Sequence, residues 1–344
     1  MSPKKDIKNY SFEELTKLTS DLGVARYRTA QIFSSLYREG RGSFDDMNTL
    51  PKDFREKLNR SFFVSAPKVS EHLRSVSGTE KVLFKLEDGR FVETVLIFAK
   101  TRKTLCLSTQ VGCKFACAFC ASGIRGYTRN LTPSEIVNQV IYFKHIAKLN
   151  ITNYVFMGMG EPLDNFDNLA TALSLMTDRR GMDVGARRIT VSTSGIIPNI
   201  EKLKALGLQI NLAVSLHAAN SDLRSKLMPV NKKYPLEDLI SACADFKGRS
   251  GRMITLEYVL IKDVNVSIGD ADDLASIAGR LRAKVNLIPY SPVDGPKFET
   301  PEAEQINKFI KRLTREGTSV TLRDTKGKDI AAACGQLAGK RNEV

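Results

Sequence analysis

Strand-like and helix-like segments alternate along most of this chain, and that alternation limits the folds it can adopt. A capping box formed by Thr132 and Glu135 predicts the start of a helix. Apolar runs after it predict six strands, at residues 154–157, 188–192, 210–215, 254–261, 285–288 and 320–322. Helical periodicity lies between these runs, at 169–176, 200–206, 236–246, 271–281 and 302–313. Repeated strand–helix units predict an α/β fold with a parallel sheet, which binds ligands at the carboxyl ends of its strands.

Three cysteines lie close together before the first of these strands. Cys113, Cys117 and Cys120 are separated by three and then two residues. Three thiolates can close around one metal centre, and a [4Fe–4S] cluster, which ordinarily takes four thiolates, would keep one iron open. The alternatives are a zinc knuckle or ordinary buried thiols. A knuckle usually has a fourth Cys or His at short spacing, whereas the next histidine is His145, on a predicted helix. The spacing therefore favours an iron–sulfur cluster.

Six short motifs stand around these cysteines in a fixed order. They are QVGC at 110–113, RNLT at 129–132, MGMGEP at 157–162, STSG at 192–195, SLH at 215–217 and ACGQL at 333–337. The set resembles the RlmN family, and the cysteine spacing resembles the signature of radical S-adenosylmethionine enzymes. The resemblance extends from about residue 11 to residue 339 and implies a methyltransferase that acts on C2 of adenine in ribosomal and transfer RNA. The alternative is the related Cfr family, which methylates adenine C8; Pro162 favours the C2 family.

The first hundred residues are organised differently from the rest. Short amphipathic helices are predicted at 12–18, 29–37 and 53–58, with arginines, Tyr27 and Tyr37 around them. This pattern fits either a module that docks RNA or a helical extension with a solvated basic face. We favour RNA docking because tyrosine rings can stack on bases. After these helices, Asp88 and Gly89 lie between two alternating segments and predict a β-hairpin, on whose second strand Glu93, taken alone, is expected to face solvent.

The resemblance implies a partial (β/α)6 radical-SAM barrel with two additions. The barrel occupies residues 101–325, a helical accessory domain that docks RNA occupies 1–66, and a β-hairpin extension occupies 67–100. The remaining C-terminal segment, 326–344, carries the last cysteine motif.

The resemblance also assigns ligands to named positions. Cys113, Cys117 and Cys120 hold a [4Fe–4S] cluster, one per chain. The residues that match S-adenosylmethionine contacts are Gly160, Glu161, Ser192, Ser215, Leu216, His217 and Ser291. The family normally has Asn where this chain has Ser291, whose side chain reaches less far. Without the resemblance, the glycines would be interpreted as turns and His217 as a hydrogen-bonded core histidine.

Adenine C2 has no nucleophilic lone pair, so it cannot take a methyl group by direct displacement. The family that this chain resembles uses two S-adenosylmethionine molecules per methylation: one methylates a protein cysteine, and the second activates that methyl group. The matching carrier is Cys334. Cys106 matches a resolving thiol that forms a transient disulfide with Cys334, and Glu93 matches a proton acceptor, a role for which Cys106 is the alternative. Nearby cations such as Lys326 or Lys328, or the sulfonium itself, are expected to lower the pKa of the carrier thiol.

Composition supports these interpretations only in part. The chain has 344 residues, with 52 Lys and Arg against 38 Asp and Glu, for a net charge of +14. This favours a polyanionic partner, although many cytosolic proteins are basic. Four of the six cysteines lie between residues 106 and 120, which in a reducing compartment argues for metal and redox chemistry rather than a disulfide framework. Cys243, outside that cluster, is expected to be a buried apolar residue.

We expect a cytoplasmic protein, because the chain has no apolar leader and no apolar run long enough to cross a bilayer. The implied partners are 23S rRNA at the peptidyl transferase centre, tRNAs at the adenosine 3′ to the anticodon, and an electron donor such as flavodoxin or ferredoxin. We expect a monomer without a membrane partner. A different class remains as an alternative, an Fe–S protein that binds RNA without methyl transfer, but such a protein would have no use for Cys334 and Cys106.

Overall fold

A ten-stranded sheet forms the centre of the molecule in the computed structural model, which describes residues 4–21, 23–324 and 326–339. Seven neighbouring strands are parallel and follow the order of the chain. They are β6 (Arg102–Cys106), β9 (Asn153–Phe156), β10 (Ile189–Thr193), β11 (Asn211–Ser215), β12 (Thr255–Leu260), β13 (Lys284–Pro289) and β14 (Ser319–Leu322). The six predicted strands are confirmed, and β6 is an additional parallel strand that precedes them.

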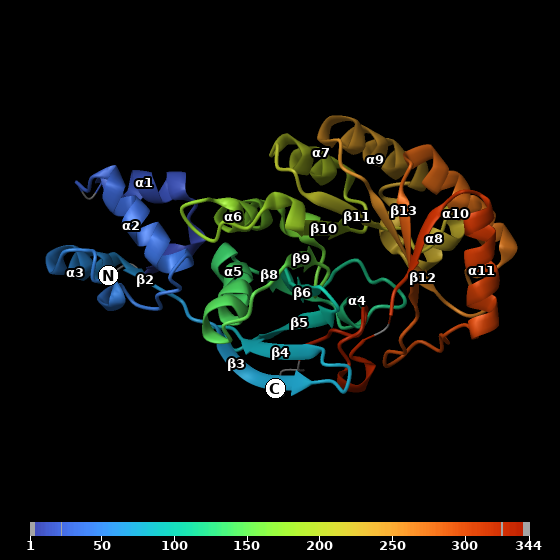
Figure 1. Cartoon of the computed structure of the whole chain (residues 1–344), viewed down its shortest axis with the longest axis horizontal. Helices are drawn as coiled ribbons and strands as arrows, with labels where there is room; N and C mark the ends of the chain where they lie inside the picture. The colour runs from blue at the N-terminus through green and yellow to red at the C-terminus, as the bar shows by residue number, and fades with distance from the viewer. Residues whose placement is uncertain (1–3, 22, 325, 340–344) are drawn as a thin grey trace.

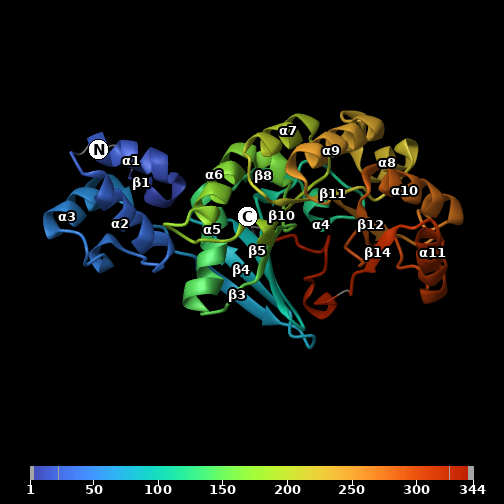
Figure 2. The ribbon, with the colours of Figure 1, turned by 45° about the horizontal axis from the view of Figure 1, so that its top comes forward.

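Helices connect the parallel strands and cover the outer face of the curved sheet, which forms an incomplete barrel (Figures 1 and 2). They are α5 (Pro133–Ile141), α6 (Phe166–Thr177), α7 (Ile197–Ala205), α8 (Ser221–Leu227), α9 (Leu236–Ser250), α10 (Ile268–Leu281) and α11 (Ala303–Arg315). A π-helical turn, η3 (Tyr142–Ile146), extends α5. The predicted capping box is present at the start of α5, where Thr132 and Glu135 bond each other's backbone N–H groups. The α/β barrel fold is thereby confirmed.

Three antiparallel strands continue the sheet beyond β6. They are β5 (Phe91–Ala99), β4 (Glu80–Lys85) and β3 (Lys68–Arg74). The predicted hairpin corresponds to β4 and β5, so it belongs to the central sheet. The sequence did not predict β3, because this edge strand is exposed over nearly its whole length and has no apolar alternation.

The N-terminal part is a small helical module at one end of the molecule (Figure 1). Its elements are β1 (Lys5–Asp6), α1 (Phe12–Asp21), α2 (Arg26–Tyr37), α3 (Lys52–Ser61) and β2 (Phe62–Phe63). The three predicted helices are confirmed. Tyr37, however, is completely buried, so the expectation that its ring could stack on RNA is wrong; its ring packs at 4.7 Å from that of Phe33, inside the module. Tyr27 is 58% exposed.

A buried lysine fastens this module to the barrel. Lys8 is 1% exposed, and its Nζ donates to the Ser65 carbonyl at 2.7 Å and to Asn138 Oδ1 at 2.9 Å. Asn138 lies on α5, the first of the helices that connect the parallel strands. Burial lowers the pKa of Lys8 to about 8, because the charged form loses water that these two acceptors only partly replace.

A two-stranded ribbon positions the cysteine loop. β7 (Gln110–Gly112) and β8 (Tyr127–Asn130) pair antiparallel, and the loop between them holds the three cysteines and the short helix α4 (Ala121–Ile124). Gly112 has a φ of +76°, and a Cβ there would lie 1.8 Å from the Gly126 carbonyl oxygen. Only glycine allows the ribbon to close so tightly.

No helix within the described residues combines the length and apolar character needed to span a membrane.

Candidate active site

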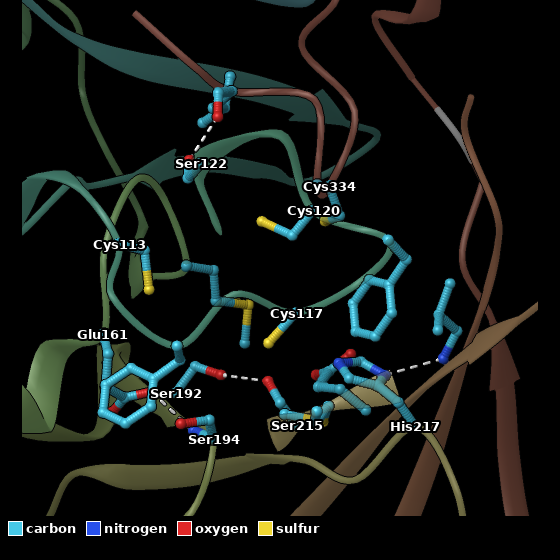
Figure 3. Close-up of a pocket in the computed structure, with 18 of the residues that line it drawn as sticks. Cys113, Cys117, Cys120, Ser122, Glu161, Ser192, Ser194, Ser215, His217 and Cys334 are labelled. Atoms are coloured by element: carbon cyan, nitrogen blue, oxygen red, sulfur yellow. Dashed lines mark hydrogen bonds between the residues drawn. The ribbon is translucent and has the colours of Figure 1, made fainter. Parts of the chain in front are cut away.

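A cavity opens at the carboxyl ends of the parallel strands, and three thiols share it. Cys113, Cys117 and Cys120 all line the cavity, and their sulfur atoms lie on different sides of it (Figure 3). Desolvation by burial raises the pKa of all three thiols, that of Cys113 to about 12. Phe115 and Phe119 add aromatic surface to the wall. The loop therefore presents an all-sulfur donor set to one cavity.

The end of β9 places a carboxylate beside these thiols. Glu161 follows β9, is 5% exposed and lines the cavity. Its two oxygens accept the backbone N–H groups of Leu163 at 3.0 Å and Ser194 at 2.7 Å. Burial raises the pKa of Glu161, although these bonds act in the opposite direction. Gly160 precedes it with a φ of +95°, and a Cβ there would lie 2.5 Å from Gln110 Cβ, so glycine is required where the two loops meet.

The next two strand ends contribute hydroxyls and an imidazole. Ser192 on β10 and Ser215 on β11 line the cavity with their Oγ atoms 3.5 Å apart. His217 also lines it, and its Nδ1 accepts the Val259 N–H at 3.0 Å, so the ring hydrogen is on Nε2. Burial, with a smaller contribution from Arg224, lowers the pKa of His217 to about 3. The ring is therefore a neutral hydrogen-bond donor at physiological pH.

Two of the seven residues predicted to contact S-adenosylmethionine do not line the cavity. Leu216 is 1% exposed and faces the core, and its carbonyl accepts a hydrogen bond from Arg224. Ser291 is 3% exposed, and its Oγ has no hydrogen-bond partner among the described residues. Its neighbour Tyr290 lines the cavity instead. The structure thus gathers Gly160, Glu161, Ser192, Ser215 and His217 around the thiols.

The C-terminal segment crosses the open side of the barrel and brings a fourth thiol to the cavity. Cys334, Gly335 and Leu337 line it, and Cys334 lies beside Cys120 in Figure 3. The segment is attached to the cysteine loop, since the Ala121 N–H donates to the Gly335 carbonyl at 2.7 Å. Cys106 ends β6 and is buried; burial and the nearby Cys334 raise its pKa to about 12.

Glu93 contacts the same C-terminal segment, beyond the residues that line the cavity. It is 7% exposed, so the expectation of a solvent-facing strand residue is wrong. Its Oε2 accepts the N–H groups of Ala338 at 2.7 Å and Gly339 at 3.0 Å, and its Oε1 pairs with Lys81 Nζ at 2.9 Å. The C-terminal segment covers Glu93, which the alternation of a hairpin strand cannot reveal. Glu93 does not line the cavity; it holds the segment that carries Cys334.

Comparisons with known proteins agree with this geometry. Two family models match the chain, the "Ribosomal RNA large subunit methyltransferase N-terminal domain" over residues 5–64 and the "Radical SAM superfamily" over residues 107–275. The "Dual-specificity RNA methyltransferase RlmN" of Geotalea uraniireducens is 44% identical over 341 residues, which cover 99% of this chain and 98% of that protein. The chain belongs to the RlmN family. The protein of the same name from Geobacter sulfurreducens is 44% identical over 337 residues, which cover 97% of this chain and 92% of that protein.

A solved structure shows the same fold. The crystal structure of a radical SAM methyltransferase from Sphaerobacter thermophilus superposes with a TM-score of 0.91 at 43% identity, over 97% of this chain and 99% of that one. As a member of the RlmN family, the chain is a radical S-adenosylmethionine methyltransferase that uses a [4Fe–4S] cluster and S-adenosylmethionine.

The residues present fit these two cofactors. The three thiols line one cavity and lie around it, which fits three corners of a cluster (Figure 3). Within the described part of the chain, no group of three Cys, His, Asp or Glu side chains is arranged to hold a single metal ion. The thiols are protonated when free, and coordination replaces their protons. Ser194 also lines the cavity, and its hydroxyl, near the Glu161 carboxylate, can bond a polar ligand.

The cation beside the carrier thiol differs from the predicted ones. Cys334 is exposed as a residue, although protein surrounds its sulfur. Arg323, directly after β14, lowers the pKa of Cys334, whereas desolvation of the sulfur, the larger effect, raises it. Lys326 Nζ donates to the Phe98 carbonyl instead, and the prediction that Lys326 or Lys328 lowers the pKa of this thiol is wrong. Spacing along the chain favoured the lysines, but strand pairing of β14 with β13 places Arg323 at the strand end.

Sequence reasoning missed Arg224, the largest completely buried side chain. Its guanidinium donates to the carbonyls of Ser194, Ser215 and Leu216 and to Asn231 Oδ1. Burial lowers its pKa to about 10. An arginine on a short helix is ordinarily a surface residue, so nothing in the local pattern around α8 indicated this role.

Proposed function

We propose that this enzyme methylates C2 of an adenosine in the peptidyl transferase centre of 23S rRNA, and the adenosine 3′ to the anticodon in tRNAs, with Cys334 as the methyl carrier. The main support is the position of Cys334, which lines the cavity of the three cluster thiols and lies near enough to Cys106 to raise its pKa. A protein that only bound RNA would need neither thiol. The relatives named above are dual-specificity RNA methyltransferases, which agrees with two RNA substrates.

In this proposal, Cys113, Cys117 and Cys120 hold the cluster, and the strand ends bind S-adenosylmethionine. Glu161 and His217 present a carboxylate and a neutral N–H donor to the cavity, and Ser192 and Ser215 add hydroxyls. When bound, the cluster and S-adenosylmethionine supply a 5′-deoxyadenosyl radical. Ser291 plays at most a lesser role, because its hydroxyl lies outside the cavity lining.

The two remaining cysteines carry the methyl group and release the product. The Cys334 thiol loses its proton, and its sulfur would attack the methyl carbon of S-adenosylmethionine, so that an S–CH3 bond forms on Cys334 while the bond between that carbon and the sulfonium breaks and S-adenosylhomocysteine leaves. Arg323 favours the thiolate. The 5′-deoxyadenosyl radical would take one hydrogen atom from the methyl group on Cys334 and become 5′-deoxyadenosine, and the remaining carbon would join adenine C2. The adduct would then give one electron back to the cluster, and its C2 proton would leave to Glu93 or to Cys106. The Cys106 thiolate then attacks the Cys334 sulfur, so that an S–S bond forms and the bond between that sulfur and the transferred carbon breaks. That carbon takes a proton and becomes the methyl group of the product.

Glu93 can act as a proton acceptor only if its present bonds change. Both of its oxygens are occupied, by Lys81 and by two amides of the C-terminal segment. We therefore propose that the segment shifts when RNA binds.

The N-terminal module docks the RNA. Tyr27 is exposed there, and the Arg28 guanidinium lies 4.8 Å above its ring, so the pair offers a surface on which a base can stack. We also propose that an electron donor such as flavodoxin or ferredoxin reduces the cluster. The protein is proposed to be a monomer and to act in the cytoplasm.

The test is anaerobic turnover of the reconstituted protein with S-adenosylmethionine and an rRNA fragment, followed by mass spectrometry of nucleosides. We expect 2-methyladenosine from the wild type and from Cys243→Ala, a matched control in which a buried thiol away from the cavity is removed. Cys334→Ala should form none while it keeps its iron. 8-Methyladenosine would assign the enzyme to C8 chemistry, and 5′-deoxyadenosine without a methylated nucleoside would refute the RNA substrate.

A further inference from the structure

Glu257 is a buried carboxylate in the cavity wall that the proposed mechanism does not use. It lies on β12, is 4% exposed and lines the cavity. Its Oε1 accepts hydrogen bonds from Asn286 Nδ2 at 2.9 Å and from Arg323 Nη2 at 3.4 Å. Its Oε2 is buried without a hydrogen-bond partner among the residues that the structure describes. Because a buried carboxylate oxygen without a donor is destabilising, a ligand that supplies one would bind favourably.

The surroundings of Glu257 select the kind of donor. Arg323 offsets the negative charge of the carboxylate, so the free oxygen suits a neutral O–H or N–H group better than a cation. Ser215, on the neighbouring strand β11, offers a hydroxyl to the same cavity, and Val259 and Ile288 give it apolar walls. A few polar groups in an otherwise apolar cavity are typical of sites for organic ligands. A nucleoside, with a flat base and sugar hydroxyls, combines both kinds of surface.

We propose that Glu257 Oε2 accepts a hydrogen bond from a hydroxyl or amino group of an adenosine moiety in the cavity. Asn286 and Arg323 hold the carboxylate in the required orientation through Oε1. The inference rests on the proposed function, which brings two adenosine moieties to this place, that of S-adenosylmethionine and the target nucleoside of the RNA. Glu257 thereby selects for adenosine by a contact that neither the motifs nor the thiols provide.

The test measures binding of S-adenosylmethionine to the reconstituted protein by anaerobic equilibrium dialysis, without RNA. Glu257→Gln keeps the shape and can keep the bonds at Oε1, but it replaces the free oxygen with an amide donor. If the donor belongs to S-adenosylmethionine, the affinity falls by about tenfold or more. The matched control is Glu237→Gln, which removes an exposed carboxylate paired with Arg280 on the surface and should leave the affinity unchanged.

A second measurement uses the wild type alone, in case the variant folds poorly. The 2′-deoxy, 3′-deoxy and N6-dimethyl analogues of S-adenosylmethionine each lack one donor, and the one that lacks the donor to Glu257 should bind about tenfold more weakly. If the wild type binds all three analogues as tightly as S-adenosylmethionine, and Glu257→Gln binds S-adenosylmethionine as tightly as the wild type does, the donor must be on the RNA. Glu257→Gln should then form less 2-methyladenosine per 5′-deoxyadenosine.

An unchanged affinity together with an unchanged product ratio would overturn the proposal. Failure of the wild type to methylate RNA is a separate result, because it would refute the proposed function and leave the measurement with S-adenosylmethionine alone intact.

Discussion

Replacement of Arg224 by methionine tests what holds the strand ends around the cavity. Methionine has a similar length but no charge and no donor. The guanidinium donates to Ser194 O at 2.7 Å, to Ser215 O and Leu216 O at 3.2 Å each, and to Asn231 Oδ1 at 2.8 Å. All four acceptors belong to the ends of β10 and β11 or to the turn after α8, and the substitution leaves them buried without this donor.

The magnitude follows from two opposing contributions. The Leu216 carbonyl keeps the Ala218 N–H as a donor. Each of the other three buried acceptors that loses its donor destabilises the fold by about 1–3 kcal/mol, which gives roughly 3–9 kcal/mol. Removal of a buried cation recovers several kcal/mol of desolvation free energy. We expect Arg224→Met to lower the free energy of unfolding by about 3 kcal/mol, and Arg224→Lys, which keeps the charge but reaches fewer acceptors, by about half of that.

Urea denaturation of the reconstituted protein, followed by circular dichroism, measures this loss. The control is Arg312→Met, which removes a half-buried surface arginine paired with Asp272 and Glu316 and should change stability by less than about 0.5 kcal/mol. If Arg224→Met lies within 1 kcal/mol of the wild type, the bonds of the guanidinium only offset its desolvation, and our account of the strand ends is incorrect.

Three further predictions concern His217, Glu93 and Arg323. His217 is neutral in the folded protein, with a pKa of about 3, so the unfolded chain binds more protons between pH 3 and about 6.5. The free energy of unfolding therefore falls as the pH drops below 6.5, by up to about 1.4 kcal/mol per pH unit more in the wild type than in His217→Asn. Parallel pH profiles of the two proteins in urea denaturation would contradict this. Glu93→Gln should raise the hydrogen-exchange rate of the Ala338 and Gly339 amides about tenfold, because the carboxylate that accepts their hydrogen bonds is lost. Hydrogen-exchange mass spectrometry measures this rate, and an unchanged rate would show that other contacts hold the segment. Arg323→Gln should raise the pKa of the Cys334 thiol, because it removes the cation that lowers it. Alkylation of Cys334 by iodoacetamide at pH 8 should then be slower than in the control variant Arg312→Gln. An equal rate in the two variants would exclude Arg323 as the activating cation.

Much of the barrel could be predicted because its signals are local. The predicted strands contain short apolar runs, and the connecting helices show a period of 3.6 residues; both patterns are visible within single segments. The place of the site could also be predicted, since parallel strands with sequential order bring their carboxyl ends together. β6 and β3 were missed because β6 begins with Arg102 and Lys103 and β3 lies at an exposed edge, so neither shows a clear apolar pattern.

The role of the C-terminal segment could not be predicted without the structure. Glu93 and Ala338 are 245 residues apart in the chain and meet only because the segment crosses the open side of the barrel. The same holds for Asp329, which accepts hydrogen bonds from Ser75 Oγ at 2.6 Å and from the Val76 N–H at 3.0 Å in the turn between β3 and β4. Contacts of this kind depend on tertiary arrangement, and neither periodicity nor a short motif encodes them.

The buried charges at the strand ends have a common physical reason. Glu161 joins the end of β9 to the end of β10 through the Ser194 N–H, and Arg224 joins the ends of β10 and β11 through backbone carbonyls. The backbone carbonyl of Glu257 in turn accepts the N–H groups of Leu216 and His217, which join β11 to β12. Apolar side chains could stabilise these ends only by filling the space between them. Hydrogen bonds from charged and backbone groups hold the ends in place and leave that space open for ligands, so the loss of any one should disturb the cavity before it disturbs the sheet.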